Sequence, residues 1–331
     1  MPDLTVLWLV VILALAFDYI NGFHDTANAI ATSVSTRALQ PQHAVYLAAT
    51  LNFLGALVST GVAKTIGGDI VTSASMVNQQ VIMAALAGAI AWNLWTWWYG
   101  IPSSSSHALI GGVMGAVIAS KGIYALKAAG IQKIILSLIL SPVIALATGY
   151  VVMILMLWVF GRFAPNVLNN SFRRMQLLSA SLMSFSHGSN DAQKAMGIIT
   201  LALLSAGQIE TLEVPLWVKL SCAVAMGLGT MAGGWKIIKT MGTKIFRMEP
   251  INGFAADLNS ALVIFCATFL HLPVSTTHVV SGSIMGVGSA KRVTAVRWSV
   301  ARSMVFAWVL TIPLSALTAA LVYYALELLI R

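Results

Sequence analysis

Two aspartates lie in parts of the chain that are otherwise almost entirely apolar. They belong to the stretches NGFHDTANA (21–29) and SHGSNDAQKA (186–195), which interrupt long runs of Leu, Ile, Val and Ala. If these runs cross a bilayer, an ionised aspartate near its centre costs about 3 kcal/mol on insertion scales. Asp25 and Asp191 therefore imply a partner of opposite charge or a water-filled cavity.

Amide side chains accompany both carboxylates. Asn28 lies one helical turn after Asp25, and Asn190 directly precedes Asp191. Each stretch also contains Gly and Asn residues that are able to interrupt a helix. Unwound backbone carbonyls, amide oxygens and carboxylates suit a hard, dehydrated cation. We therefore expect Na⁺ at Asp25 and at Asp191, with H⁺ as the alternative coupling ion; two structural, helix-breaking polar sites are the other interpretation.

Lys194 occupies the position that matches Asn28 in the second stretch. It follows Asp191 by three residues and so shares a helix face with it, which favours an ion pair over contact with a bound anion. Two more acids are candidates either for an extra cation site or for wetted, inert positions: Asp18, seven residues before Asp25, and Asp257, beside Asn259.

Hydroxyl side chains cluster after two prolines, in PSSSSH (102–107) and PVSTTH (273–278). Each cluster opens an apolar segment of about 15 residues, which is too short to span a bilayer. Pro suits the first turn of a helix, and Ser or Thr satisfies its free N–H groups. Two such N-termini facing each other carry partial positive charge and suit a tetrahedral oxyanion. The alternative is that the hydroxyls only cap buried helix ends. The candidate anion ligands are Ser104, Ser105, Ser106, Ser275, Thr276 and Thr277.

A histidine follows each hydroxyl cluster directly. We expect His107 and His278 to be satisfied core residues that fix a loop rather than ligands.

The composition places these residues in a membrane. Hydrophobic residues make up 58% of the 331 residues and charged residues 9%, whereas a soluble domain has about 25% charged residues. Apolar runs such as 4–20 and 131–160 are long enough to cross a bilayer. The chain has a net charge of +9, but its sequence contains no basic patch with interleaved aromatic residues, which excludes a nucleic-acid partner. Cys222 and Cys266 lie in apolar stretches and indicate neither a disulfide framework nor a metal site.

The chain contains an internal duplication. Residues 21–30 align with 187–196 at an offset of 166, and residues 101–115 align with 272–286 at an offset of 171. A weaker similarity relates 63–68 to 238–243. The expected organisation is a first repeat (1–160), a cytoplasmic linker (161–174) and a second repeat (175–331).

Basic residues predict how the repeats lie in the membrane. If 4–35 and 175–205 are interrupted crossings, and 78–120 and 252–289 are hairpins that turn at their prolines, twelve Lys and Arg fall on one side and six on the other. The richer side is cytoplasmic by the positive-inside rule, so both termini are extracytoplasmic and the repeats are inverted. The expected fold is an all-α polytopic membrane protein of about 12 helical segments, with broken helices and two re-entrant hairpins that meet at the midplane, as in secondary transporters.

At these motifs the chain resembles the inorganic phosphate transporter (PiT) family, which carries phosphate with Na⁺ or H⁺. The resemblance rests on GFHDTANA, on HGSNDAQKA and on both P-x-S-[ST]-[ST]-H motifs, and it covers nearly the whole chain. It implies phosphate at the Ser/Thr clusters and coupling ions at Asp25 and Asp191. Lys194 matches the bacterial branch, whereas other members have Asn there.

The resulting hypothesis is a non-enzymatic symporter that imports phosphate with Na⁺ across the plasma membrane, without a prosthetic group and with lipid and a possible second copy as partners. Proton-coupled symport and transport of another oxyanion such as sulfate are the alternatives. The paired buried carboxylates count against a passive anion channel, and a phosphohydrolase would need metal-ligand spacing or a poised nucleophile.

Overall fold

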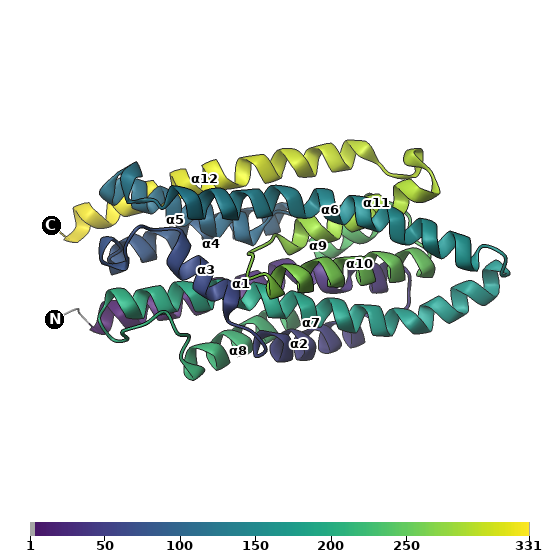
Figure 1. The fold of residues 1–331 in the computed structure, drawn as a ribbon, viewed down its shortest axis with the longest axis horizontal. Coiled ribbons are helices and arrows are strands. Elements are labelled where there is room, and N and C mark those ends of the chain that lie inside the picture. The colour runs from purple at the N-terminus through teal and green to yellow at the C-terminus, as the bar shows by residue number, and fades with distance from the viewer. Residues whose placement is uncertain (1–3, 331) are drawn as a thin grey trace.

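The computed structural model describes residues 4–330 as a bundle of helices that lie side by side along one axis (Figure 1). The α-helices follow in this order: α1 (Leu4–Ser35), α2 (Pro41–Ala56), α3 (Gly61–Asp69), α4 (Gln79–Tyr99), α5 (Ser105–Lys121), α6 (Ala128–Phe160), α7 (Pro165–Ser205), α8 (Leu216–Ala232), α9 (Trp235–Lys239), α10 (Pro250–Phe269), α11 (Thr276–Lys291) and α12 (Trp298–Ile330). The expectation of about twelve helical segments is confirmed.

Several helices have the length and apolar composition of membrane spans. They are α1, α4, α6, α10 and α12, and two bent pairs pass the same test when each is taken as one span. The pair α2 and α3 bends by 68°, and α8 with the segment Trp235–Lys244 bends by 63°. The chain is therefore a multi-pass helical membrane protein, with a sharp bend inside each of these two pairs.

The two halves of the chain run in opposite directions. Helix α1 starts at one end of the bundle, whereas α7 starts at the far end; α12 ends at the same end at which α1 starts (Figure 1). Helix α1 packs on α8 and α2 packs on α7, while α5 packs on α12 and α11 packs on α6. Each of these contacts has a counterpart when the halves are exchanged, which is the arrangement expected of a duplicated chain.

The predicted interruptions of α1 and α7 are wrong. Both helices continue without a break through 21–29 and 187–196. Their glycines serve packing instead of turning: a Cβ on Gly22 would lie 2.6 Å from the carbonyl oxygen of Met226 in α8, and Gly188 lies against the backbone of α2 at Asn52. The helix that carries each candidate aspartate is thus pressed against a helix of the other half. Helix α7 also begins at Pro165, within the segment that the sequence assigned to the linker.

The two hairpins turn where the sequence predicted. Helix α4 ends at Gly100, which has a φ of 64°, and Ser104 caps α5 by accepting a hydrogen bond from the backbone N–H of His107. In the second half, Ser275 caps α11 by accepting from the N–H of His278. With 17 and 16 residues, α5 and α11 reach only about 25 Å, less than the thickness of the hydrocarbon layer.

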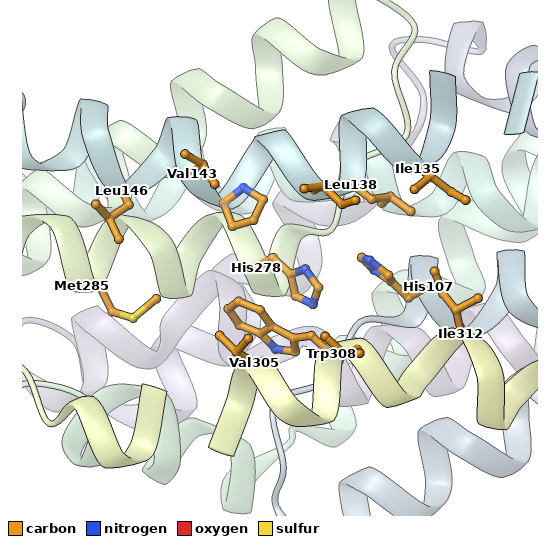
Figure 2. Close-up of a pocket in the computed structure, with 13 residues that line it drawn as sticks. His107, Ile135, Leu138, Val143, Leu146, His278, Met285, Val305, Trp308 and Ile312 are labelled. Atoms are coloured by element: carbon orange, nitrogen blue, oxygen red, sulfur yellow. The ribbon is translucent and has the colours of Figure 1, made fainter. Parts of the chain in front are cut away.

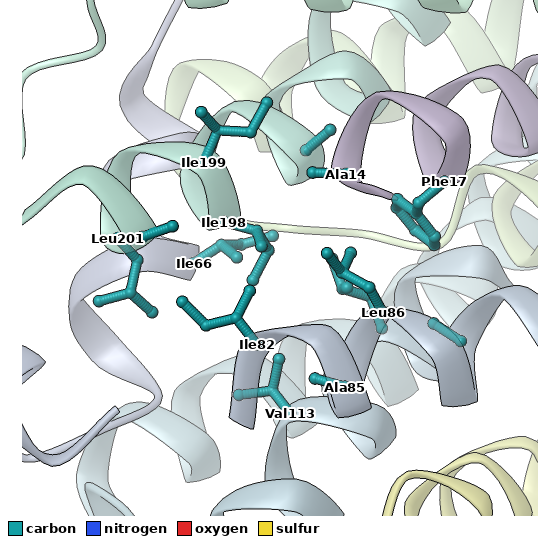
Figure 3. Packing of buried hydrophobic residues seen from close by; sticks show 14 of the residues in the cluster. Ala14, Phe17, Ile66, Ile82, Ala85, Leu86, Val113, Ile198, Ile199 and Leu201 are labelled. Carbon is teal, nitrogen blue, oxygen red and sulfur yellow. The ribbon is translucent and has the colours of Figure 1, made fainter. Parts of the chain in front are cut away.

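On the side toward the N-terminal end of α1, a layer of packed apolar side chains covers the middle of the bundle. Figure 3 shows Ala14 and Phe17 of α1 together with side chains of α3, α4, α5 and α7 in one cluster, and the labelled residues are buried. The polar residues of α1 and α7 therefore lie beyond a dry layer.

Candidate functional site

The N-termini of α5 and α11 meet at the centre of the bundle. The hydroxyl of Ser106 donates a hydrogen bond to the carbonyl of Val274, just before α11, at 2.8 Å. The rings of His107 and His278 are 4.5 Å apart between centroids. Two helix N-termini, each equivalent to about half a positive charge, therefore come together in a buried region.

Asp25 of α1 lies against both hairpin tips. The hydroxyl of Ser105 donates to its Oδ2 at 3.0 Å, and that of Thr277 donates to its Oδ1 at 3.4 Å. His24 places Nδ1 2.6 Å from the same Oδ1. Asp25 is 2% exposed, so these groups replace water around its carboxylate.

Asp191 of α7 is held by a cation from its own helix. The Nζ of Lys194 lies 2.7 Å from its Oδ1, and the hydroxyl of Thr276 donates to its Oδ2 at 3.2 Å. The Nε2 of His187, one turn earlier, is 3.5 Å from Oδ2. Lys194 and Asp191 are both inaccessible to solvent, so the ammonium offsets a charge that would otherwise be buried alone.

Cross-contacts join the two aspartate sites into one. Asn28 donates from Nδ2 to the hydroxyls of Thr276 and Thr277, at 3.2 and 3.0 Å. Lys194 donates from Nζ to the hydroxyl of Ser105 at 3.5 Å. Each half of the chain thus contacts the hairpin tip of the other half. Asn28 and Lys194 occupy matching positions in the two halves, but Asn28 is neutral and Lys194 carries a positive charge.

The arrangement offers ligand atoms for a cation. One side-chain ligand atom from each of Asp25, His187 and Asp191 lies within 4.8 Å of the other two. The Oδ1 of Asn28 is buried without a hydrogen-bond partner among the described residues. Carboxylate and amide oxygens fit Na⁺ better than a soft metal ion.

The six predicted hydroxyls take different positions. Ser105, Thr276 and Thr277 face the carboxylates, whereas Ser106 links the hairpins through Val274. The other two, Ser104 and Ser275, cap their helices. Each of these three hydroxyls has one proton, so it donates to an anion only after it turns away from its carboxylate.

The structure does not bring Asn190 to Asp191. Its Nδ2 donates to the hydroxyl of Thr268 at 2.9 Å and to the carbonyl of Leu272 at 3.3 Å. Its Oδ1 accepts from the N–H of Val274 at 3.5 Å. The amide of Asn190 therefore makes its hydrogen bonds to the α10–α11 hairpin rather than to Asp191.

Among the described residues, the remaining predicted acids make no hydrogen bond to the hairpin tips. Asp257 of α10 accepts hydrogen bonds from the hydroxyls of Thr32, at 2.5 Å, and Ser179, at 3.4 Å. Asp18 of α1 is buried, and neither of its oxygens has a hydrogen-bond partner among the described residues.

The histidines of the hairpins line an apolar cavity of about 520 Å³ (Figure 2). The cavity lies between α6 and α12, and Trp308 of α12 stacks on His278 with ring centroids 3.9 Å apart. Trp308 also donates from Nε1 to the carbonyl of Pro102 at 3.0 Å, and Nδ1 of His107 lies 2.7 Å from the hydroxyl of Ser104. These contacts tie α12 to both hairpin tips.

Two site residues were missed by the sequence analysis. His24 and His187 lie in the quoted stretches and touch Asp25 and Asp191. The spacing of four residues between His187 and Asp191 places both on one helix face, so the sequence did contain a signal for that pair.

A helical membrane protein with a buried centre of carboxylates, hydroxyls and helix N-termini has the construction of a secondary transporter. The family model described as the phosphate transporter family matches residues 21–167 and 162–319. The chain is 56% identical over 322 residues to a "Probable low-affinity inorganic phosphate transporter" of Bacillus subtilis (strain 168), covering 97% of each. A protein of the same description from Rhizobium meliloti (strain 1021) is 48% identical over 317 residues, 95% of each chain. The chain therefore belongs to the phosphate transporter family, as its motifs predicted, and its relatives are transporters rather than enzymes.

A solved structure has the same architecture. It is described as "The sodium-dependent phosphate transporter", is 27% identical, and matches with a TM-score of 0.87 over 98% of this chain and 99% of that chain. The expected all-helical transporter fold is thereby confirmed.

Proposed function

We propose that this chain imports inorganic phosphate together with Na⁺ across the plasma membrane, with the phosphate held between the tips of α5 and α11. The observation that carries the proposal is the convergence of Ser105, Thr276 and Thr277 on two buried carboxylates at facing helix N-termini. Hydroxyls and free backbone N–H groups at such a place are donors for the oxygens of a tetrahedral anion.

The carboxylates favour phosphate over sulfate. Near neutral pH the dianion HPO₄²⁻ has one P–OH group, which can donate a hydrogen bond to the carboxylate of Asp25 or Asp191. Sulfate has no proton, so its oxygens repel a carboxylate at the same distance. Competition by sulfate in an uptake assay measures this preference: we expect phosphate uptake to persist in excess sulfate.

Charge arithmetic gives the number of cations. Phosphate enters with a charge of about −2, and Asp25 and Asp191 add two more negative charges. Lys194 and two helix N-termini of about +0.5 each offset roughly two of these four. About two monovalent cations should therefore accompany each phosphate before the loaded site can move.

Asp25 with the open Oδ1 of Asn28 offers one Na⁺ site. The oxygens of Asp191 that face Asp25 and His187 offer a second, with Asn190 excluded by its own hydrogen bonds. The sodium dependence named for the structurally similar transporter supports this choice of ion. Import follows from coupling to an inwardly directed Na⁺ gradient, and the basic residues predict that both termini are extracytoplasmic.

Proton coupling is the second candidate, and a specific observation favours it. His24 and His187 touch the two carboxylates, and each ring offers a nitrogen atom that can bind a proton. Uptake of labelled phosphate into liposomes separates the candidates: we expect a Na⁺ gradient to drive uptake at equal pH on both sides. Uptake that responds only to a pH gradient would support the second candidate.

A further inference from the structure

Three polar side chains on α1 and α4 are buried without partners. Among the described residues, both oxygens of Asp18 and both polar atoms of Asn21 and of Asn93 lack a hydrogen-bond partner, and all three residues are 0% exposed. A buried polar group without a hydrogen bond costs about 1–3 kcal/mol, and a charged group costs more. Six unsatisfied atoms on neighbouring helices require a common explanation.

The packing of α1 against α4 places these side chains at neighbouring levels. His24 contacts Thr96 at 3.1 Å, and Asn21 and Asn93 each precede these residues by three positions, or one helical turn. Helices α1 and α4 run in the same direction, because α2 and α3 return the chain to the end where α1 began (Figure 1). The two amides therefore lie at one level, and Asp18 follows one turn closer to the N-terminus.

The surroundings leave Asp18 without a counter-ion. Phe17 and Ala14 of α1 and Leu86 of α4 belong to the apolar layer on its N-terminal side (Figure 3). The buried ammonium of Lys194 makes its ion pair with Asp191, at 2.7 Å.

Four oxygens on these three residues can act as cation ligands: two carboxylate oxygens and one from each amide. A single carboxylate with neutral amide oxygens suits a monovalent cation, because protein sites for divalent ions combine several carboxylates or keep many waters. Na⁺ binding would satisfy the oxygens and neutralise Asp18 in one step.

We propose that Asp18, Asn21 and Asn93 form a Na⁺ site of their own, separate from the cations at Asp25 and Asp191. Its ion does not touch phosphate. It joins α1 to α4 one turn before the contact between His24 and Thr96, and so fixes the helix that presents Asp25. The choice of Na⁺ rests on the proposed function, whereas the existence of the site rests on the unpartnered atoms.

The test is equilibrium binding of radioactive Na⁺ to purified protein without phosphate. We expect Asp18→Asn to bind one Na⁺ fewer than wild type. Asn93→Ala should weaken the same ion about tenfold, the effect of one lost ligand. Glu213→Gln removes the same charge as Asp18→Asn from an exposed position and should match wild type.

An unchanged Na⁺ count and affinity in Asp18→Asn would overturn the proposal, since Asp18 would then be protonated or bound to water. If that variant does not fold, unchanged Na⁺ binding in Asn93→Ala overturns it equally. Asp25→Asn separates this outcome from a failure of the proposed function. If Asp25→Asn alone lowers the Na⁺ count, the site at Asp18 is refuted and the proposed function stands; if Asp18→Asn alone lowers it, the reverse holds.

Discussion

Replacing Ser105 by Ala tests whether the anion binds at the hairpin tips. The hydroxyl of Ser105 is buried between the two charged groups of the site: it donates to Oδ2 of Asp25 at 3.0 Å and lies 3.5 Å from Nζ of Lys194. Among the described residues it is the one hydrogen-bond donor to that oxygen. Alanine leaves the helix intact, because the capping hydroxyl belongs to Ser104.

The expected loss follows from the charge of the partner. A hydrogen bond to a charged group contributes about 1.5–3 kcal/mol, and each 1.4 kcal/mol is a factor of ten in an equilibrium constant. In the proposed bound state this hydroxyl turns from Asp25 to the phosphate, so Ser105→Ala should raise the Kd for phosphate about ten- to a hundred-fold. Thr276→Ala and Thr277→Ala should act similarly, since their hydroxyls donate to Asp191 and Asp25.

Phosphate binding to purified protein, measured by calorimetry in saturating Na⁺, gives these constants. Ser189→Ala is the matched control: Ser189 is equally buried and lies two residues before Asp191, but its hydroxyl donates to the carbonyl of Ser186. Its affinity should stay within about threefold of wild type. Wild-type affinity in Ser105→Ala, Thr276→Ala and Thr277→Ala alike would refute the reasoning, because the anion would then bind elsewhere.

Three more predictions follow from packing, charge and topology. Lys194→Met leaves Asp191 buried without its cation, which costs about 3–5 kcal/mol and should lower the melting temperature by several degrees; a midpoint within about 2 °C of wild type would contradict this. Gly22→Ala should destabilise the protein because its Cβ would lie 2.6 Å from the carbonyl of Met226, whereas Gly227→Ala, 3.4 Å from its nearest neighbour, should be neutral or stabilising by thermal unfolding. In a background without Cys222 and Cys266, a cysteine in Glu210→Cys should react with an impermeant reagent from outside and one in Lys239→Cys should not; the opposite labelling would reject the proposed orientation.

The hairpins could be predicted from sequence because their signals are local. Proline, a capping hydroxyl and a short apolar helix occur within a few residues, and the duplication repeats them. The capping roles of Ser104 and Ser275 are set by neighbours three residues away. The ion pair between Lys194 and Asp191 could likewise be predicted from sequence, because the two residues are three positions apart on one helix.

The course of α1 and α7 could not be predicted in this way. Gly22 and Gly188 are equally suited to a helix break and to close packing, and the choice depends on α8 and α2, which are distant in sequence. The amide of Asn190 is likewise directed by Thr268 and Leu272, about eighty residues away. Local composition carries no information about such contacts.

The most direct test of coupled binding at the two carboxylates is the affinity for phosphate with Na⁺ varied against choline at fixed pH. If Na⁺ binds beside the anion, Na⁺ must tighten phosphate binding, and phosphate must tighten Na⁺ binding by the same factor. We expect this dependence in wild type and its loss in Asp25→Asn, with the helical fold retained. A phosphate affinity that ignores Na⁺ and instead follows pH would contradict the account and assign the coupling to H⁺.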